Sequence, residues 1–187
     1  NLRENDLLTT GARGMHAPHM TFRDAARVLI AHILNPNPGR DAPRLVRRFG
    51  ALPCANPAIF DDPAPFSLRA ILPDHTIETL EDATAALIEI FAEHDKTTGF
   101  EAASRNCHSA QPLKPECRIE IFEEDDFAII RMAGLPYAFE GPPVNARDWT
   151  PSQDERLRLG RQAKCFVNDQ VIDRIAQSFK TVEEAQQ

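Results

Sequence analysis

The sequence predicts an α+β fold that is mainly helical and includes a small antiparallel sheet. Apolar residues recur at helical spacing in several segments, and two short runs of alternating residues flank an acidic turn. The 187 residues are 42% hydrophobic and 26% charged, as in a globular protein. No flexible Gly/Ser linker divides them, so we expect one domain over residues 1–187 with its own core.

Helical periodicity is clearest in the first half of the chain. Thr21 and Thr79 are suitable N-caps, and an aspartate, Asp24 or Asp82, follows each of them by three residues. An aspartate at that offset places negative charge in the first turn, where the helix dipole favours it. The predicted helices cover residues 22–34, 41–49 and 79–94, within a helical part that spans residues 21–95.

The second half of the chain predicts strands followed by a helix. Alternating residues indicate a hairpin over about residues 117–132, with a short acidic run as its turn. Residues 163–167 are expected to add a third strand, and residues 133–160 are expected to be irregular. Asn168 is a suitable cap for a C-terminal helix that ends at about residue 179, before a frayed tail. Hairpin and helix together make up residues 117–180.

The composition also indicates where the protein resides. No apolar run is long enough to span a membrane, and no signal peptide is visible. The four cysteines are widely and irregularly spaced, which favours reduced thiols over disulfides. We therefore expect a cytoplasmic protein without membrane contact.

Charge is distributed unevenly along the chain. The net charge is −7, but residues 1–50 contain eight arginines, no lysine and four acidic residues. The planar fork of arginine suits phosphate and guanine, although arginine is also common on solvated helix faces. Three of these arginines are expected to face outward from the predicted helix 41–49: Arg44, Arg47 and Arg48.

No motif in the chain predicts catalysis or a metal site. His16 and His19 form a pair flanked by methionines, but a metal ion needs further ligands, and none is near in the sequence. Cys107 and Cys117 lack the close spacing of a structural zinc site. Neither a nucleophile elbow nor a glycine-rich phosphate loop is present. We therefore expect no catalytic residues, no metal and no cofactor, and we do not expect an enzyme.

Residues 2–34 resemble a known pattern. In order, they contain Leu2-Arg3-Glu4, Leu7-Leu8, a Gly/Arg turn, Ala17-Pro18-His19-Met20-Thr21 and Arg23-Asp24-Ala25-Ala26. This order resembles phage- and prophage-type DNA-binding regulatory proteins of bacteria, which carry an N-terminal helix-turn-helix. The resemblance implies that residues 1–20 are the trailing end of such a region, truncated upstream, with residues 1–8 ending a helix.

The resemblance also implies which residues contact DNA. Arg13, His16 and His19 would lie in a wing-like loop beside the duplex, with Arg3 and Arg23 flanking it. The expected function is therefore that of a DNA-associated transcriptional regulator or accessory protein of phage type. The alternative is a non-enzymatic module for protein interaction or homodimer formation without DNA contact, which the acidic remainder of the chain favours.

Overall fold

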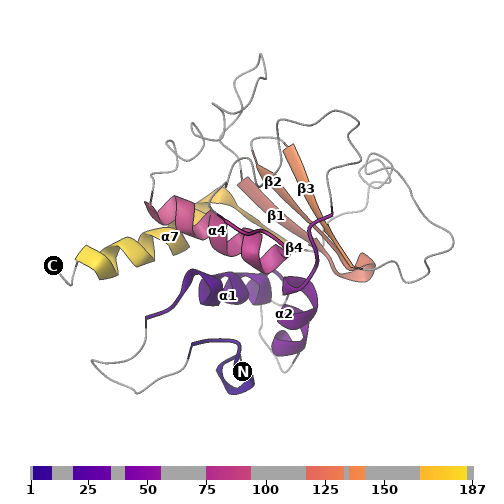
Figure 1. Cartoon of the computed structure of the whole chain (residues 1–187), viewed down its shortest axis with the longest axis horizontal. Coiled ribbons are helices and arrows are strands. Elements are labelled where there is room, and N and C mark those ends of the chain that lie inside the picture. The colour runs from indigo at the N-terminus through magenta and orange to yellow at the C-terminus, as the bar shows by residue number, and fades with distance from the viewer. Residues whose placement is uncertain are drawn as a thin grey trace, which may run out of the picture.

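The computed structural model describes residues 2–9, 19–34, 41–55, 75–93, 117–132, 135–141 and 165–184 (Figure 1). This part of the chain is an α+β fold, mainly helical, with one four-stranded antiparallel sheet, as the sequence predicts. The helices are α1 (Phe22–Leu34), α2 (Ala42–Gly50), α4 (Leu80–Glu93) and α7 (Asp169–Glu184). The strands are β1 (Cys117–Phe122), β2 (Phe127–Met132), β3 (Leu135–Glu140) and β4 (Cys165–Asn168).

The sheet has the strand order β3-β2-β1-β4, and all neighbouring strands are antiparallel. Its register aligns apolar residues across the strands, since Ile119 lies opposite both Ile130 and Val167, and Ile130 lies opposite Tyr137. Because side chains alternate along a strand, these four residues share one face of the sheet.

That face of the sheet packs against the helices. One cluster of buried side chains includes residues of all four helices and all four strands. The opposite face holds a smaller cluster of Phe127, Ile129 and Ala138. Helix α4 contacts α1, α2 and α7, so it is the central helix of the helical layer (Figure 1).

The predicted helix caps are confirmed. The amide of Asp24 donates to Thr21 Oγ1 at 3.1 Å, and the amide of Thr21 donates back to Asp24 Oδ2 at 2.9 Å. Thr79 and Asp82 make the same reciprocal pair at the start of α4. At the start of α7, the amide of Val171 donates to Asn168 Oδ1 at 3.3 Å. Each side chain satisfies a backbone donor that the helix itself leaves without an acceptor.

Residues 1–8 are predicted to end a helix, and among the described residues 2–8 the structure has one 3₁₀ turn, Arg3–Asn5, with no buried residue. The turn stops at Asp6, which adopts a left-handed conformation with φ of 56°. Aspartate tolerates that conformation better than most residues, and a chain in it cannot continue a right-handed helix.

Two expectations for the second half of the chain are corrected. Strand β3 lies within residues that the sequence predicts to be irregular. The sequence pattern did not indicate this strand because it contains Pro136, and proline is rare in central strands. The strand tolerates proline because it is at the edge of the sheet. The C-terminal helix continues to Glu184 instead of fraying after residue 180. The predicted hairpin is confirmed, and the third strand pairs with β1 as β4.

Candidate nucleic-acid interface

The structure describes three of the five residues predicted to contact DNA. Arg3 lies in the 3₁₀ turn and is exposed, and His19 is exposed just before α1. Arg23 lies in the first turn of α1, and its side chain is 56% exposed. Arg13 and His16 lie outside the described residues.

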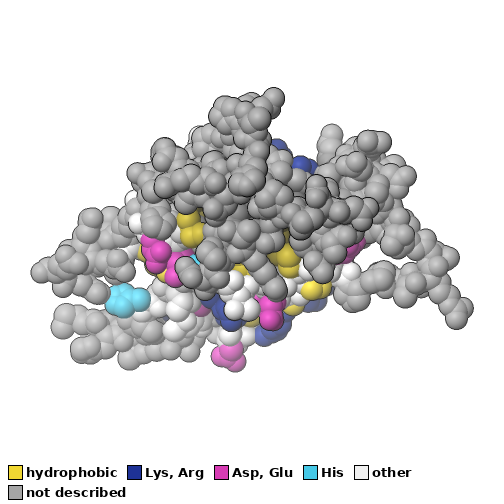
Figure 2. All heavy atoms as spheres, turned by 45° about the horizontal axis from the view of Figure 1, so that its top comes forward, with side chains coloured by type: hydrophobic (Ala, Val, Ile, Leu, Met, Phe, Trp, Pro, Cys, Tyr) yellow, Lys and Arg dark blue, Asp and Glu magenta, His cyan; other side chains and the backbone are white. Residues whose placement is uncertain are grey.

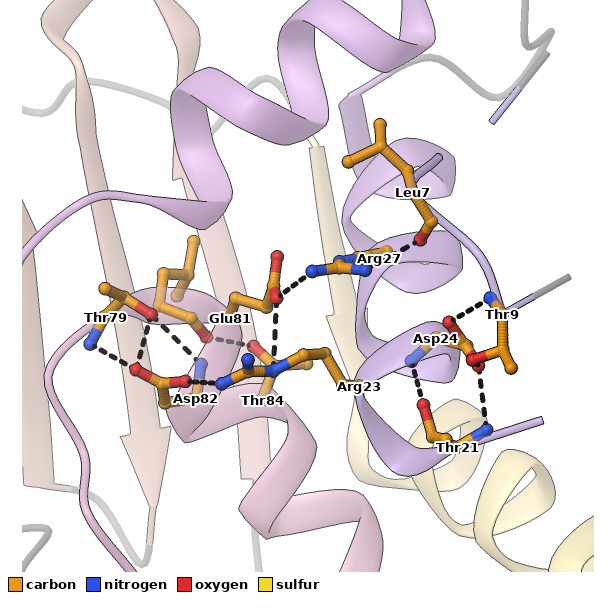
Figure 3. Close-up of polar contacts among 11 residues, drawn as sticks. Leu7, Thr9, Thr21, Arg23, Asp24, Arg27, Thr79, Glu81, Asp82 and Thr84 are labelled. Atoms are coloured by element: carbon orange, nitrogen blue, oxygen red, sulfur yellow. Dashed lines mark hydrogen bonds and ion pairs between the residues drawn. The ribbon is translucent and has the colours of Figure 1, made fainter. Parts of the chain in front are cut away.

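Arg23 takes part in an ion-pair network that joins α1 to α4 (Figure 3). Its Nε lies 3.3 Å from Glu81 Oε1, and its Nη2 donates to Asp82 Oδ1. The same Glu81 oxygen lies 2.9 Å from Nη2 of Arg27, one helical turn further along α1. Two guanidinium groups thus face two carboxylates, and the charge of Arg23 is balanced within the protein.

Asp24, the residue after Arg23 in α1, has a different set of partners. Its carboxylate caps the helix through Thr21 and also accepts two hydrogen bonds from Thr9, from the amide at 2.9 Å and from Oγ1 at 2.6 Å (Figure 3). Burial acts to raise the pKa of Asp24, but these hydrogen bonds from Thr9 and Thr21 outweigh it and lower the pKa below its usual value of 3.8. Asp24 is therefore ionised at neutral pH and holds the segment that contains Thr9 against α1.

Residues 2–9 form a segment that we call the strap. Arg27 Nη1 donates to the carbonyl oxygen of Leu7 at 3.0 Å, and Arg47 Nη2 donates to that of Asn5 at 2.7 Å. The side chain of Leu7 is buried in the main core. The strap is thus fastened to α1 by Arg27 and Asp24, and to α2 by Arg47.

Helix α2 presents arginines on its outer face. Leu45, Val46 and Phe49 are buried on its inner face. The outer arginines differ in their partners. Arg44 is 64% exposed, and its Nε lies 3.9 Å from Asp41 Oδ1. Arg47 is exposed and bonds the Asn5 carbonyl.

Arg48, the third outer arginine, is paired with the hairpin. Its Nε donates to Asp126 Oδ1, and its guanidinium lies 5.2 Å from the centre of the Phe49 ring. The hydrogen bond to Asp126 raises the pKa of Arg48. This arginine therefore connects α2 to the turn between β1 and β2.

The structure brings Arg3 and the arginines of α2 into one region, because the turn that carries Arg3 is bonded to Arg47. Arg44 and Arg47 were not among the predicted contact residues. The signal that could have identified them is their i, i+3 spacing opposite a buried face, which places both side chains on the same side of the helix.

This region offers exposed guanidinium groups as hydrogen-bond donors. Exposed guanidinium groups donate hydrogen bonds to phosphate or carboxylate, whereas a proton-transfer site needs a group that titrates near neutral pH. In Figure 2, basic and acidic side chains of the described residues lie next to one another near the lower edge of the face shown. On that face, basic side chains of the described residues therefore have acidic neighbours that offset their charge.

The described ranges contain no group of three or more His, Cys, Asp and Glu residues placed to hold a metal ion. None of their helices combines the length and apolar character that crossing a membrane requires. No protein-family model, curated protein or solved structure matches this chain.

Proposed function

We propose that this protein is a DNA-associated transcriptional regulator or accessory protein of phage type, acting in the cytoplasm. The observation that carries the proposal is the pair of exposed arginines on α2, Arg44 and Arg47. Guanidinium groups bind phosphate oxygens in a bidentate manner. Side chains at positions i and i+3 of a helix are about 5–6 Å apart at Cβ, so both can reach one stretch of DNA backbone.

The contacts proposed for α2 position the protein on DNA without reading its sequence. Arginine bonds to phosphate carry no base information, and base recognition needs side chains in a groove. The net charge of −7 repels DNA elsewhere on the protein, which limits productive contact to this basic region. Arg13 and His16, which the resemblance implies lie beside the duplex, would reach its phosphates or its minor groove.

Duplex binding by fluorescence anisotropy at two salt concentrations tests the proposal. Replacing both Arg44 and Arg47 by alanine should weaken binding to every duplex. It should also reduce the slope of log affinity against log salt by about one for each phosphate that the protein no longer neutralises. Arg174→Ala, at an exposed arginine of α7, is the matched control and should leave binding unchanged. Absence of duplex binding by the unaltered chain at low salt would contradict the proposal.

The individual residues predicted to contact DNA have separate expected effects. Arg3→Ala and Arg13→Ala should weaken duplex binding, and changes at His16 and His19 should have smaller effects. Arg23 is the weakest candidate because Glu81 and Asp82 already balance its charge. If Arg23→Ala lowers stability more than it lowers affinity, then Arg23 serves the contact between α1 and α4.

The alternative function is a module for protein interaction or homodimer formation, and one observation favours it. Met20 and Val28 are large apolar residues that are 54% and 39% exposed, before and on α1. Sedimentation equilibrium of the unaltered chain and of a Met20→Ser/Val28→Ser variant distinguishes the two functions. A dimer that the double change dissociates, together with no response to DNA, would favour the alternative.

A further inference from the structure

The acceptor bonded to Arg47 is a neutral one from its own chain. Arg47 Nη2 donates to the backbone carbonyl of Asn5, and Arg47 remains exposed. A phosphate oxygen is charged and accepts shorter and stronger hydrogen bonds from a guanidinium group than a peptide carbonyl does. The Asn5 carbonyl thus occupies a donor that an oxyanion would bind more strongly.

The charge of the strap opposes the same binding. Residues 2–9 contain one arginine, Arg3, and two acidic residues, Glu4 and Asp6, so the strap carries a net charge of −1. Glu4 and Asp6 are exposed and flank Asn5 in the sequence, so they lie in the segment bonded to Arg47. The docked strap therefore lowers the positive potential around Arg47, and its release would raise that potential.

The strap buries little apolar surface. Leu7 is its one buried side chain, Leu2 is partly buried against the same core, and the 3₁₀ turn buries none. Hydrogen bonds from Arg27 and Arg47, and those of Thr9 to Asp24, add to these contacts. Segments with so little buried apolar surface open at a lower free energy than the core does. The strap can therefore leave while the helices and the sheet stay folded.

We propose that Arg44 and Arg47 form a phosphate-binding position on α2 and that the strap covers it as an internal competitor. A phosphate group displaces the Asn5 carbonyl from Arg47 and releases the strap. The shared ligand chemistry is a phosphate oxyanion, whose source is either the DNA backbone or a free polyphosphate. The proposal rests on the proposed function only for the choice of DNA as that source.

Two changes weaken the strap without touching the arginines of α2. Leu7→Ala removes its buried anchor, and Thr9→Val keeps the side-chain shape but removes the hydroxyl that donates to Asp24. Ile175→Ala, at a half-buried position on α7 remote from the strap in sequence, controls for a general loss of core packing. Both strap variants should bind duplex DNA more tightly than the unaltered chain. The gain should be about tenfold for Leu7→Ala, because DNA no longer has to replace the hydrogen bond between Arg47 and the Asn5 carbonyl. The control should bind as the unaltered chain does.

Arg47 must be the group through which the strap acts. The double variant Leu7→Ala/Arg47→Ala should bind DNA no more tightly than Arg47→Ala alone. Without Arg47, the strap no longer competes with DNA for a guanidinium group. An equal gain from Leu7→Ala in both backgrounds would overturn the proposal. So would weaker binding by the strap variants, because it would mean that the docked strap positions Arg3 on the DNA.

Hydrogen exchange reports strap release without relying on DNA. The amide of Thr9 is bonded to Asp24 Oδ1, so it should exchange slowly in the docked state and faster when tripolyphosphate or duplex DNA is added. If tripolyphosphate speeds exchange in a chain that does not bind duplex DNA, then the phosphate site is supported and the proposed function is contradicted. Unchanged exchange with both ligands at high concentration would overturn the inference itself.

Discussion

Asp24 shows how one side chain can serve two segments. The sequence predicted its role at the start of α1, because an N-cap threonine followed three residues later by an acidic residue is a local signal. The bonds from Thr9 to the same carboxylate could not be predicted, since Thr9 is fifteen positions away in the chain and local patterns carry no information on that distance. Its tie to the strap therefore emerged only from the structure.

The low pKa of Asp24 makes its contribution to stability depend on pH. Because the pKa in the folded state lies below the usual 3.8, the stabilisation is fully present above that value and is lost as pH falls through the folded-state pKa. Asp24→Asn should lower the free energy of unfolding by about 1 kcal/mol at neutral pH, and by less at about pH 3. Urea unfolding at both pH values measures the difference.

Asp41 provides the comparison for that experiment. It precedes α2 but makes no side-chain cap hydrogen bond, and it is exposed. Asp41→Asn should therefore change stability little at either pH. If Asp24→Asn lowers the free energy of unfolding by the same amount at low and neutral pH, then the shape of the Asp24 side chain explains its role and its charge does not.

At the scale of secondary-structure elements, the contact between α1 and α4 combines apolar packing with an ion-pair network. Sequence periodicity predicted both helices, because the apolar residues of an amphipathic helix recur at helical spacing. It did not predict that the outer residues Arg23 and Arg27 of α1 meet Glu81 at the start of α4. That pairing depends on how the helices cross, which the pattern of a single helix does not contain.

The pair formed by Arg27 and Glu81 should contribute measurably to stability. Their side chains are only 22% and 15% exposed, so solvent screens them less than a surface pair. A double-mutant cycle of Arg27→Gln and Glu81→Gln should give a coupling energy of about 1 kcal/mol that declines only modestly with added salt. Both side chains of the pair Arg44 and Asp41 are exposed, so this pair should give a coupling energy near zero.

For the part of the molecule that the structure describes, the sequence predicted the fold class, the hairpin and the four helices, but not the complete sheet. Strand β3 contains Pro136, and its outer edge is bonded by residues 53–55 from a distant part of the chain. The candidate interface was predicted less well. The arginines of α2 were expected to face outward, but their connection to the strap depends on contacts between segments far apart in the sequence.

A core that joins every element should unfold cooperatively. Ile172 is fully buried on α7, within the cluster that also contains the helices and strands of the rest of the fold. Ile172→Ala should lower the free energy of unfolding by about 2–5 kcal/mol. Far-ultraviolet circular dichroism and the fluorescence of a label on α2 should report the same midpoint in urea. A transition of α7 separate from that of α2 would show that the elements unfold independently.

The strand order β3-β2-β1-β4 also has a consequence for the time course of folding. Strands β1, β2 and β3 follow one another directly, so their contacts close short loops. Strand β4 reaches β1 only after the long stretch of chain between Gly141 and Cys165, which makes its closure slower because more chain entropy is lost. A nascent chain would therefore assemble the three-stranded meander first and acquire β4 and α7 last, and until then the edge of β1 would remain open to strands of other chains.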